Sequence, residues 1–144
     1  MARHSELVKI PRIDRYVSKL ALGSAPLGGL FTAVSDEEGQ KTILAALDSG
    51  INFIDTAPLY GHGNAEKMIG SALGKTNKPF VISTKVGPVL EKFAPEEIAG
   101  KVEGLAPFIG VDPTIFPVFD FTRDGILRSI EESLSRLKNS SIDI

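Results

Sequence analysis

Residues 51–61, INFIDTAPLYG, are the most informative part of this sequence. Residues 51–55 are short and rich in β-forming side chains, which predicts a strand that ends at Asp55. Tyr60 follows Asp55 by five residues and is expected on the connecting loop. The stretch therefore places a carboxylate at the end of a strand and a phenol on the loop that leaves it.

A helix is expected directly before this strand. Residues 35–38, SDEE, form a capping box, in which a hydroxyl side chain is followed three residues later by a carboxylate. Ile43, Leu44 and Leu47 come next at helical spacing. Gly50 is placed to end the helix in a left-handed turn.

Helices and strands also alternate after residue 61. Residues 64–73 predict a second helix with Gly74 at its end, and residues 79–84 predict the next strand. A third helix is predicted from about residue 122 to 138, and residues 142–144 are typical of the opening of another strand. The buried stripe of the third helix is expected to consist of its regularly spaced apolar residues, Ile126, Leu127, Ile130, Leu134 and Leu137.

The N-terminal segment completes the order of elements. Residues 7–22 alternate apolar and polar side chains around residues 11–14, which predicts a β-hairpin leading into a strand near residues 19–22. Residues 23–29, GSAPLGG, predict a loop. A hairpin, three strand–helix units and a strand start indicate an α/β fold with parallel pairing and right-handed crossovers. Both an open doubly wound sheet and a closed barrel fit this order, and periodicity alone does not separate them.

Residues 86–121 are much longer than an ordinary strand-to-helix connection, and long loops tend to be functional or disordered. Residues 95–97, PEE, are expected to start a short helix. The segment also carries Phe108, Phe116, Phe119 and Phe121, which either form an apolar wall or pack into a small core of the loop itself. Both interpretations remain open at this point.

Composition narrows the classes of protein. A chain of 144 residues is expected to form one domain, residues 1–144. The net charge of −2 disfavours nucleic-acid binding, and the absence of cysteine excludes disulfides, zinc–thiolate sites and thiol catalysis. No stretch has the roughly 20 apolar residues of a membrane helix, and the first twenty residues contain no signal-peptide core. The expected location is the cytoplasm, with no metal site.

Three reactive side chains are expected at one end of the parallel strands, where loops gather and sites are found. Asp55 and Lys85 end neighbouring strands about 4.8 Å apart, so their charges can pair, and Tyr60 lies on the loop between them. Tyrosine, with a pKa of about 10, is a poor acid at neutral pH unless a cation stabilises its phenolate. A phenol tuned by a lysine that a carboxylate holds in place can protonate a carbonyl oxygen as hydride arrives at the carbon.

Each of these residues alone has an ordinary explanation. An aspartate at a strand end usually caps or solvates a loop, a tyrosine before a glycine usually packs, and a lysine after a buried strand is usually solvated. The catalytic interpretation therefore depends on their joint placement.

Three separated segments resemble the aldo-keto reductase family. Residues 51–66 closely resemble its signature around a catalytic aspartate and tyrosine, and residues 83–87, STKVG, resemble its catalytic-lysine strand. Residues 22–28, LGSAPLG, are similar to its first strand and nicotinamide-side loop. The resemblance runs from about residue 7 to the end. It implies the N-terminal part of a (β/α)8 TIM barrel and an oxidoreductase that uses NADP or NAD.

Carried over residue by residue, the resemblance makes Tyr60 the general acid/base, with Lys85 lowering its pKa and Asp55 pairing with Lys85. Gly23, Ser24 and Asp55 would border the nicotinamide. Residues 118–134 resemble the subgroup that oxidises aldoses at C1, including L-fucose and D-threo-aldose dehydrogenases, and pyridoxal 4-dehydrogenase. The implied partner is a small carbonyl or sugar substrate.

The chain also departs from the family pattern. The family's fourth catalytic residue is a histidine at the end of the fourth strand, and the sequence stops at Ile144, just before it. His62 and His4 are expected to be exposed loop residues rather than substitutes. Because the phosphate-binding loops after strands seven and eight are also missing, residues 1–144 are expected to be a truncated form, inactive alone and prone to self-associate through open barrel edges.

Two other functions fit the sequence less well than a dehydrogenase does. A non-catalytic interaction protein on the same scaffold, like the reductase-like β subunits of potassium channels, is disfavoured because Asp55, Tyr60 and Lys85 are all present. A Gly-rich phosphate binder using residues 23–29 is disfavoured because that loop has neither Gly-Lys-Ser/Thr nor the spacing of a dinucleotide fingerprint.

Overall fold

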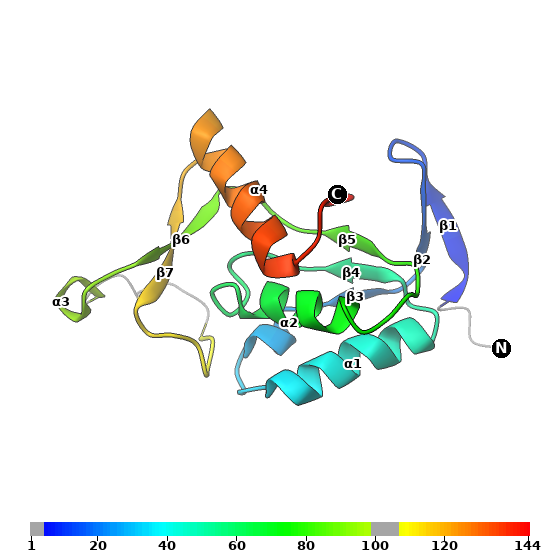
Figure 1. Ribbon diagram of the computed structural model, residues 1–144, viewed down its shortest axis with the longest axis horizontal. Coiled ribbons are helices and arrows are strands. Elements are labelled where there is room, and N and C mark those ends of the chain that lie inside the picture. Colours follow the sequence, from blue (N-terminus) through cyan, green and yellow to red (C-terminus); the bar gives the residue numbers. More distant parts are fainter. Residues whose placement is uncertain (1–4, 99–106) are drawn as a thin grey trace.

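The computed structural model describes residues 5–98 and 107–144, which form a parallel sheet with an antiparallel hairpin at each end of its strands (Figure 1). The strands of the sheet lie in the order β3-β4-β5. The first hairpin joins β1 and β2, and the second joins β6 and β7. Their bounds are β1 Leu7–Ile10, β2 Arg15–Ser18, β3 Ala21–Gly23, β4 Phe53–Asp55, β5 Val81–Ser83, β6 Pro88–Lys92 and β7 Ile115–Phe119.

The predicted helices are present with closely similar bounds, as α1 Asp36–Asp48, α2 Asn64–Leu73, α3 Pro95–Ile98 and α4 Arg123–Leu137. Residues 23–29, predicted as a loop, also contain a short 3-10 helix, η2 Pro26–Gly28. Ser35 and Glu38 cap α1 reciprocally, which confirms the capping box, and Gly50 follows the helix with a φ of 85°. The short helix predicted at residues 95–97 is α3.

The order of the parallel strands places the helices on one face of the sheet. Each connection from β3 to β4 to β5 moves one strand in the same direction, and right-handed crossovers then put their helices on the same side. The helices α1, α2 and α4 accordingly pack side by side in chain order. An open doubly wound sheet needs a reversal of strand order to cover its other face, so this arrangement favours the barrel.

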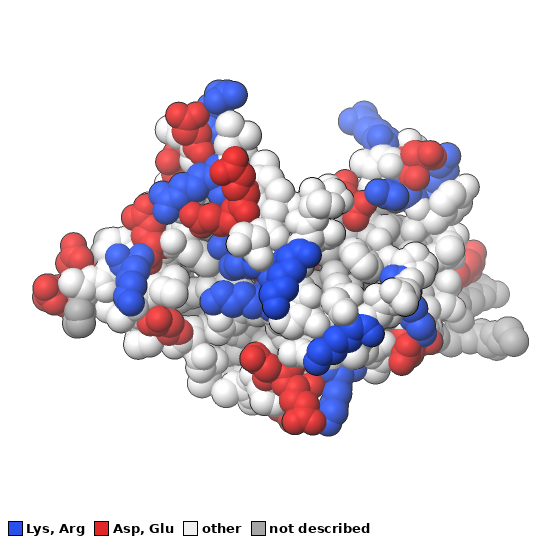
Figure 2. Space-filling view, in the orientation of Figure 1, with Lys and Arg blue, Asp and Glu red and all other residues white. Residues whose placement is uncertain are grey.

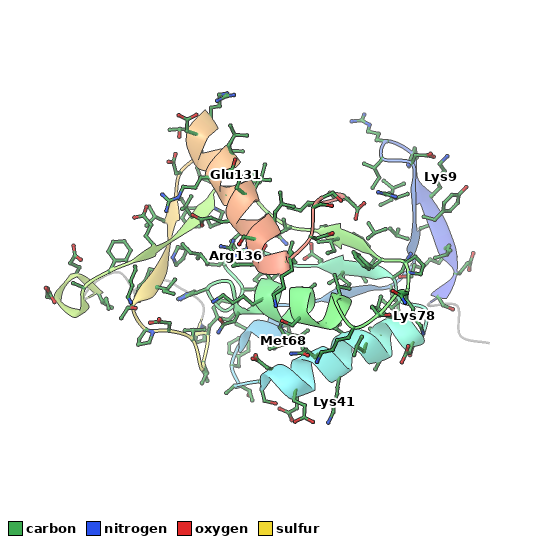
Figure 3. The ribbon with its side chains drawn as sticks, viewed as in Figure 1. Lys9, Lys41, Met68, Lys78, Glu131 and Arg136 are labelled. Carbon is green, nitrogen blue, oxygen red and sulfur yellow. The ribbon has the colours of Figure 1, made fainter. Side chains whose placement is uncertain are left out.

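The core lies between the sheet and these helices. Its fully buried members include Ile43 of α1, Ile54 of β4, Ile69 of α2 and Ile82 of β5. Met68 lies between α2 and α1 (Figure 3), where its sulfur occupies the space that a side chain at Gly39 would need.

The buried stripe predicted for α4 is wrong except at Leu137. The buried residues of α4 are Gly125, Ser129, Ser133 and Leu137, one on each turn, whereas Leu127 is exposed and Ile126, Ile130 and Leu134 are half-buried. The small residues let α4 approach its neighbours closely, and the Ser129 hydroxyl donates to the carbonyl of Pro88 at 3.0 Å. Ile130 and Leu134 instead line a cavity of about 400 Å³, together with Thr84, Val86, Ile142 and Ile144.

The two hairpins occupy opposite ends of the sheet. The β1–β2 hairpin lies at the end where the strands begin, because the Asn52 side chain accepts from the Ser18 amide at 2.7 Å and donates to the Tyr16 carbonyl at 3.0 Å. Arg15 adds an ion pair of 2.9 Å with Asp143. The β6–β7 hairpin rises from the end where the strands finish (Figure 1).

Residues 142–144 show the pairing expected of a further parallel strand. The Thr84 amide donates to the Ile144 carbonyl, and the Ile144 amide donates to the Ile82 carbonyl, each at 3.1 Å. This alternation of bonds between two chain segments is that of a parallel ladder beside β5.

The four phenylalanines of the long connection divide between the two interpretations. Phe108 and Phe116 pack around the His62 ring, and Phe116 also meets Phe93, so this pair belongs to a small core formed by β7 and by residues 93–98 and 107–114, the described part of the insertion between β6 and β7. Phe119 and Phe121 stack on each other with ring centroids 6.0 Å apart and are 56% and 68% exposed. Only the second pair is available to form an apolar wall.

Candidate active site

Three strand ends lie at the same level on one rim of the sheet. In the parallel register, Gly23 of β3 is opposite Asp55 of β4, which is opposite Ser83 of β5. The backbone bonds continue one step further, because the Ser24 amide donates to Asp55 and the Thr56 amide donates to Ser83. The side chains of Asp55 and Ser83 therefore project from adjacent strands at the same edge.

Asp55, the last residue of β4, forms an ion pair with Lys85, which lies two residues beyond the end of β5 and not at its last position as predicted. The Lys85 Nζ lies 3.0 and 3.2 Å from the two carboxylate oxygens of Asp55 and donates to the Thr56 carbonyl at 2.8 Å. The Ser83 hydroxyl donates to the same carboxylate at 2.5 Å. The Lys85 and Asp55 side chains are 47% and 36% exposed, so the pair is fixed by its geometry while remaining open to a ligand.

Tyr60 completes the predicted triangle. The Lys85 Nζ stands 4.9 Å from the centroid of the Tyr60 ring, within cation–π range. Asp55, Tyr60 and Lys85, which the sequence predicts to share one site, are therefore in direct contact through the ammonium group.

The surroundings of Lys85 keep it charged. Partial burial lowers its pKa, but hydrogen bonding and charge interactions with Asp55 and Tyr60 outweigh burial and leave the pKa above its ordinary value. The side chain is therefore an ammonium ion throughout the neutral range. It is a fixed positive charge beside the phenol.

Gly23 and Ser24, the residues expected to border a nicotinamide, lie next to this triangle. No described atom lies within 4 Å of the point where a Cβ on Gly23 would stand, so this flank of the rim is open. Ser24 is fully buried, and within the described ranges its hydroxyl has no hydrogen-bond partner. An open flank and an unpaired hydroxyl fit a ligand with a flat ring and polar substituents.

The prediction that His62 is an exposed loop residue is wrong. Its side chain is 8% exposed and lies between the rings of Phe108 and Phe116, at centroid distances of 6.1 and 5.5 Å. The insertion that covers it comes from more than 40 residues further along the chain, which a local pattern does not reveal. Burial lowers the pKa of His62, against a smaller opposing effect of a backbone hydrogen bond with Ile115. His4 lies outside the described residues.

A second charged group, which the sequence analysis does not predict, is buried behind the rim. Glu66 of α2 is 0% exposed, and its carboxylate accepts from Arg136 Nε at 2.6 Å and from the Thr84 hydroxyl at 2.8 Å. Arg136 lies where α4 meets α2 (Figure 3). Glu66 precedes the buried residues Ile69 and Leu73 by three and seven positions, so helical spacing already placed it on the buried face.

In the described ranges 5–98 and 107–144, no group of three or more His, Asp or Glu side chains is arranged to hold a metal ion. No helix in that part of the chain combines the length and the apolar character of a membrane span. On the face shown in Figure 2, basic and acidic side chains are interspersed.

The sequence is similar to those of known oxidoreductases. Residues 19–144 match the model of the aldo/keto reductase family. The chain is 36% identical to pyridoxal 4-dehydrogenase of Microbacterium luteolum over 97% of its own length and 42% of that protein. It is 40% identical to D-threo-aldose 1-dehydrogenase of a Pseudomonas species over 89% of its length and 39% of that protein. These relatives belong to the subgroup that residues 118–134 suggest.

Solved structures confirm the fold. The glycerol dehydrogenase of Gluconobacter oxydans superposes with a TM-score of 0.71 at 32% identity, over 99% of this chain and 38% of that one. The architecture is therefore that of the N-terminal part of a (β/α)8 barrel, and the chain spans about two-fifths of the length of these relatives. Solved members of the family include complexes with NADPH and with NADP. The chain belongs to the aldo/keto reductase family, whose members are NAD(P)-dependent oxidoreductases.

Proposed function

We propose that the whole protein transfers hydride between NADP or NAD and the carbonyl or hydroxyl carbon of an aldose or aldehyde, with Tyr60 as general acid/base. The observation that carries this proposal is the position of the Lys85 ammonium, held by Asp55 at 3.0 Å and facing the Tyr60 ring at 4.9 Å. A phenol, a fixed cation and a carboxylate at one rim supply the proton chemistry of carbonyl reduction.

The Tyr60 hydroxyl donates the proton in one direction of the reaction and accepts it in the other. When a carbonyl is reduced, this hydroxyl gives its proton to the carbonyl oxygen, and the resulting phenolate is stabilised by the Lys85 charge nearby. When an alcohol is oxidised, the phenolate takes the proton back. Asp55 holds Lys85 in place in both directions, and the Thr56 carbonyl fixes the ammonium from a second side.

The dinucleotide, when bound, supplies or accepts the hydride at the nicotinamide ring. Gly23 and Ser24 are the residues that would flank this ring, because one leaves open space at the rim and the other presents a buried hydroxyl without a partner among the described residues. Asp55 lies between them and Lys85 in the register of the sheet. The proposed contact surface for the nicotinamide is thus the end of β3 and β4.

The substrate class is supported by the relatives and by an exposed aromatic pair. Pyridoxal and D-threo-aldoses, the substrates named for two relatives, are ring compounds that carry or mask an aldehyde. Phe121 lies against Gly87, two residues after Lys85, and stacks on Phe119. Exposed aromatic rings of this kind cover the flat face of an aromatic or sugar ring.

Substitution of Tyr60 by phenylalanine tests the proposal. In the full-length polypeptide that the gene encodes, Tyr60→Phe should lower kcat about 10²-fold or more with an aldose or aldehyde, because the proton donor is lost. Binding of NADPH or NADH, followed by the change in fluorescence of the reduced nicotinamide, should be retained. Tyr16→Phe, on the exposed hairpin, is the matched control and should leave kcat unchanged. Full turnover by Tyr60→Phe would overturn the proposal.

The same experiment separates the alternative role. Cofactor binding by the unsubstituted protein without turnover of any aldose or aldehyde would favour a reductase-like interaction subunit. The cytoplasmic location, the single domain over residues 1–144, and the inactivity and self-association of these residues alone stay predictions.

A further inference from the structure

The turn that follows Tyr60 has an unusual backbone. Gly61, His62 and Gly63 all have positive φ angles, of 63°, 49° and 88°. Glycine adopts this left-handed region freely, but a residue with a Cβ, such as histidine, is strained there. A strained residue persists only where its surroundings hold it, so the contacts of His62 are decisive.

Each residue of this turn docks on a different part of the molecule. The backbone of Gly61 lies so close to Gly28 of η2 that a Cβ on Gly28 would come within 2.7 Å of the Gly61 nitrogen. Gly63 lies against the side chains of Arg136 and Leu90. The turn is therefore fixed from η2 on one side and from α4 and β6 on the other.

His62 provides the third contact, to Phe108 in the insertion and to Phe116 of β7. Its ring meets Phe108 edge-on, at an interplanar angle of 64°, and Phe116 at a tilt of 49°. Phe108 is itself tied to the loop after β3, because the amides of Phe31 and Ile109 bond the carbonyls of Pro107 and Gly29. The imidazole therefore packs the loop that carries Tyr60 against residues 107–109, which are hydrogen-bonded to the loop after β3.

We propose that His62 is a positioning residue for Tyr60: its ring, wedged between Phe108 and Phe116, holds the turn that keeps the Tyr60 phenol beside the Lys85 ammonium. This inference rests on the proposed function. The His62 ring does not touch the reacting atoms. It acts through the two peptide units of backbone that separate it from Tyr60, and a displacement of about 1 Å at a reacting group costs on the order of 10²-fold in rate.

Two substitutions distinguish the effect of the His62 ring from the effect of the left-handed backbone conformation. His62→Asn accepts the left-handed backbone readily but removes the ring, whereas His62→Phe keeps a ring between Phe108 and Phe116 at the cost of more backbone strain. In the full-length polypeptide, His62→Asn should lower kcat at least about tenfold with the KM for the cofactor within about twofold. His62→Phe should restore kcat to within about threefold of the parent.

Val17→Ala is the matched control for lost stability. Val17 is 4% exposed on the hairpin at the opposite end of the sheet, so its truncation destabilises the fold without touching the tyrosine loop. It should leave kcat unchanged at temperatures where the variant is folded. A fall in kcat as large as that of His62→Asn would show that stability alone explains the effect and would overturn the proposal.

A spectroscopic measurement makes the test independent of turnover. When 3-fluorotyrosine is placed at position 60 alone, the fluorine NMR signal of the full-length polypeptide comes from this ring only. Adding His62→Asn should shift and broaden this signal, whereas adding Val17→Ala should do neither. An unchanged signal in His62→Asn would refute the positioning role even if Tyr60→Phe is inactive. Activity retained by Tyr60→Phe would refute the proposed function instead.

Discussion

Removal of the buried carboxylate of Glu66 should cost the protein a large part of its stability. Glu66 is fully buried, and its two carboxylate oxygens are used by Arg136 Nε at 2.6 Å and by the Thr84 hydroxyl at 2.8 Å. The bonds join α2 to α4 and to the chain just beyond β5. In Glu66→Ala, the Arg136 guanidinium stays behind with only 11% of its side chain exposed.

The magnitude follows from what Arg136 retains. Breaking a buried ion pair by removing one partner costs about 3–5 kcal/mol. Arg136 keeps a contact of 3.6 Å with Glu132 and a hydrogen bond of 3.1 Å to Ser133, which places the loss near the lower limit. The Thr84 hydroxyl also loses its acceptor, at about 1 kcal/mol. We therefore expect Glu66→Ala to lower the free energy of unfolding by about 3–4 kcal/mol.

Urea unfolding followed by far-ultraviolet circular dichroism measures this loss by linear extrapolation, with an unchanged m-value as the check on two-state behaviour. Glu37→Ala is the matched control, because Glu37 pairs with Lys41 on the exposed face of α1, with 77% of its side chain in solvent, and its loss should be barely measurable.

The double variant Glu66→Leu, Arg136→Met should recover most of the stability, since it replaces the pair by apolar groups of similar size. A change of less than about 1 kcal/mol in Glu66→Ala would refute this account of the Glu66–Arg136 pair.

Three further predictions concern the loops at the rim. Gly28→Ala should lower kcat at least about tenfold, because its Cβ would press on the Tyr60 and Gly61 backbone, whereas Gly74→Ala, with its nearest contact at 3.7 Å, should leave kcat unchanged. Gly23→Ala should fold normally and raise the KM for the cofactor, and an unaltered KM would remove Gly23 from the nicotinamide site. Burial keeps the pKa of His62 in the folded protein below its ordinary value of 6.5. The free energy of unfolding should therefore be highest above pH 6.5 and decline as the pH falls below it, because the unfolded chain then binds the proton more readily. An equal decline in His62→Asn would exclude this cause.

The positions of Asp55 and Lys85 were predictable because parallel strands leave little freedom. Alternation along a strand fixes which face a residue occupies, and consecutive parallel strands in register bring their ends to one edge. The observed register sets Asp55 opposite Ser83, with Lys85 two residues further on. The helix bounds were predictable for a similar reason, since the bonds of the capping box at Ser35 are local in sequence.

The β6–β7 hairpin was not predictable from the same rules. Pro88 and Pro117 lie within its strands, and proline inside an apolar run argues against a strand. In a two-stranded ribbon both strands are edges, so each proline can turn its missing donor away from the partner. The burial of His62 depends on this ribbon and the insertion it carries, and the Glu66–Arg136 pair joins residues 70 positions apart.

The active-site rim therefore has two parts with different origins. Asp55 and Lys85 are placed by the strands, so the forces that build the sheet also bring their charges together. Tyr60 is placed by a loop whose turn, residues 61–63, is held by packing contacts from η2, α4 and the insertion. Changes to those contacts should move the phenol relative to a cation that stays where it is. Loss of turnover without loss of the Asp55–Lys85 pair is thus the behaviour that this division of the rim requires.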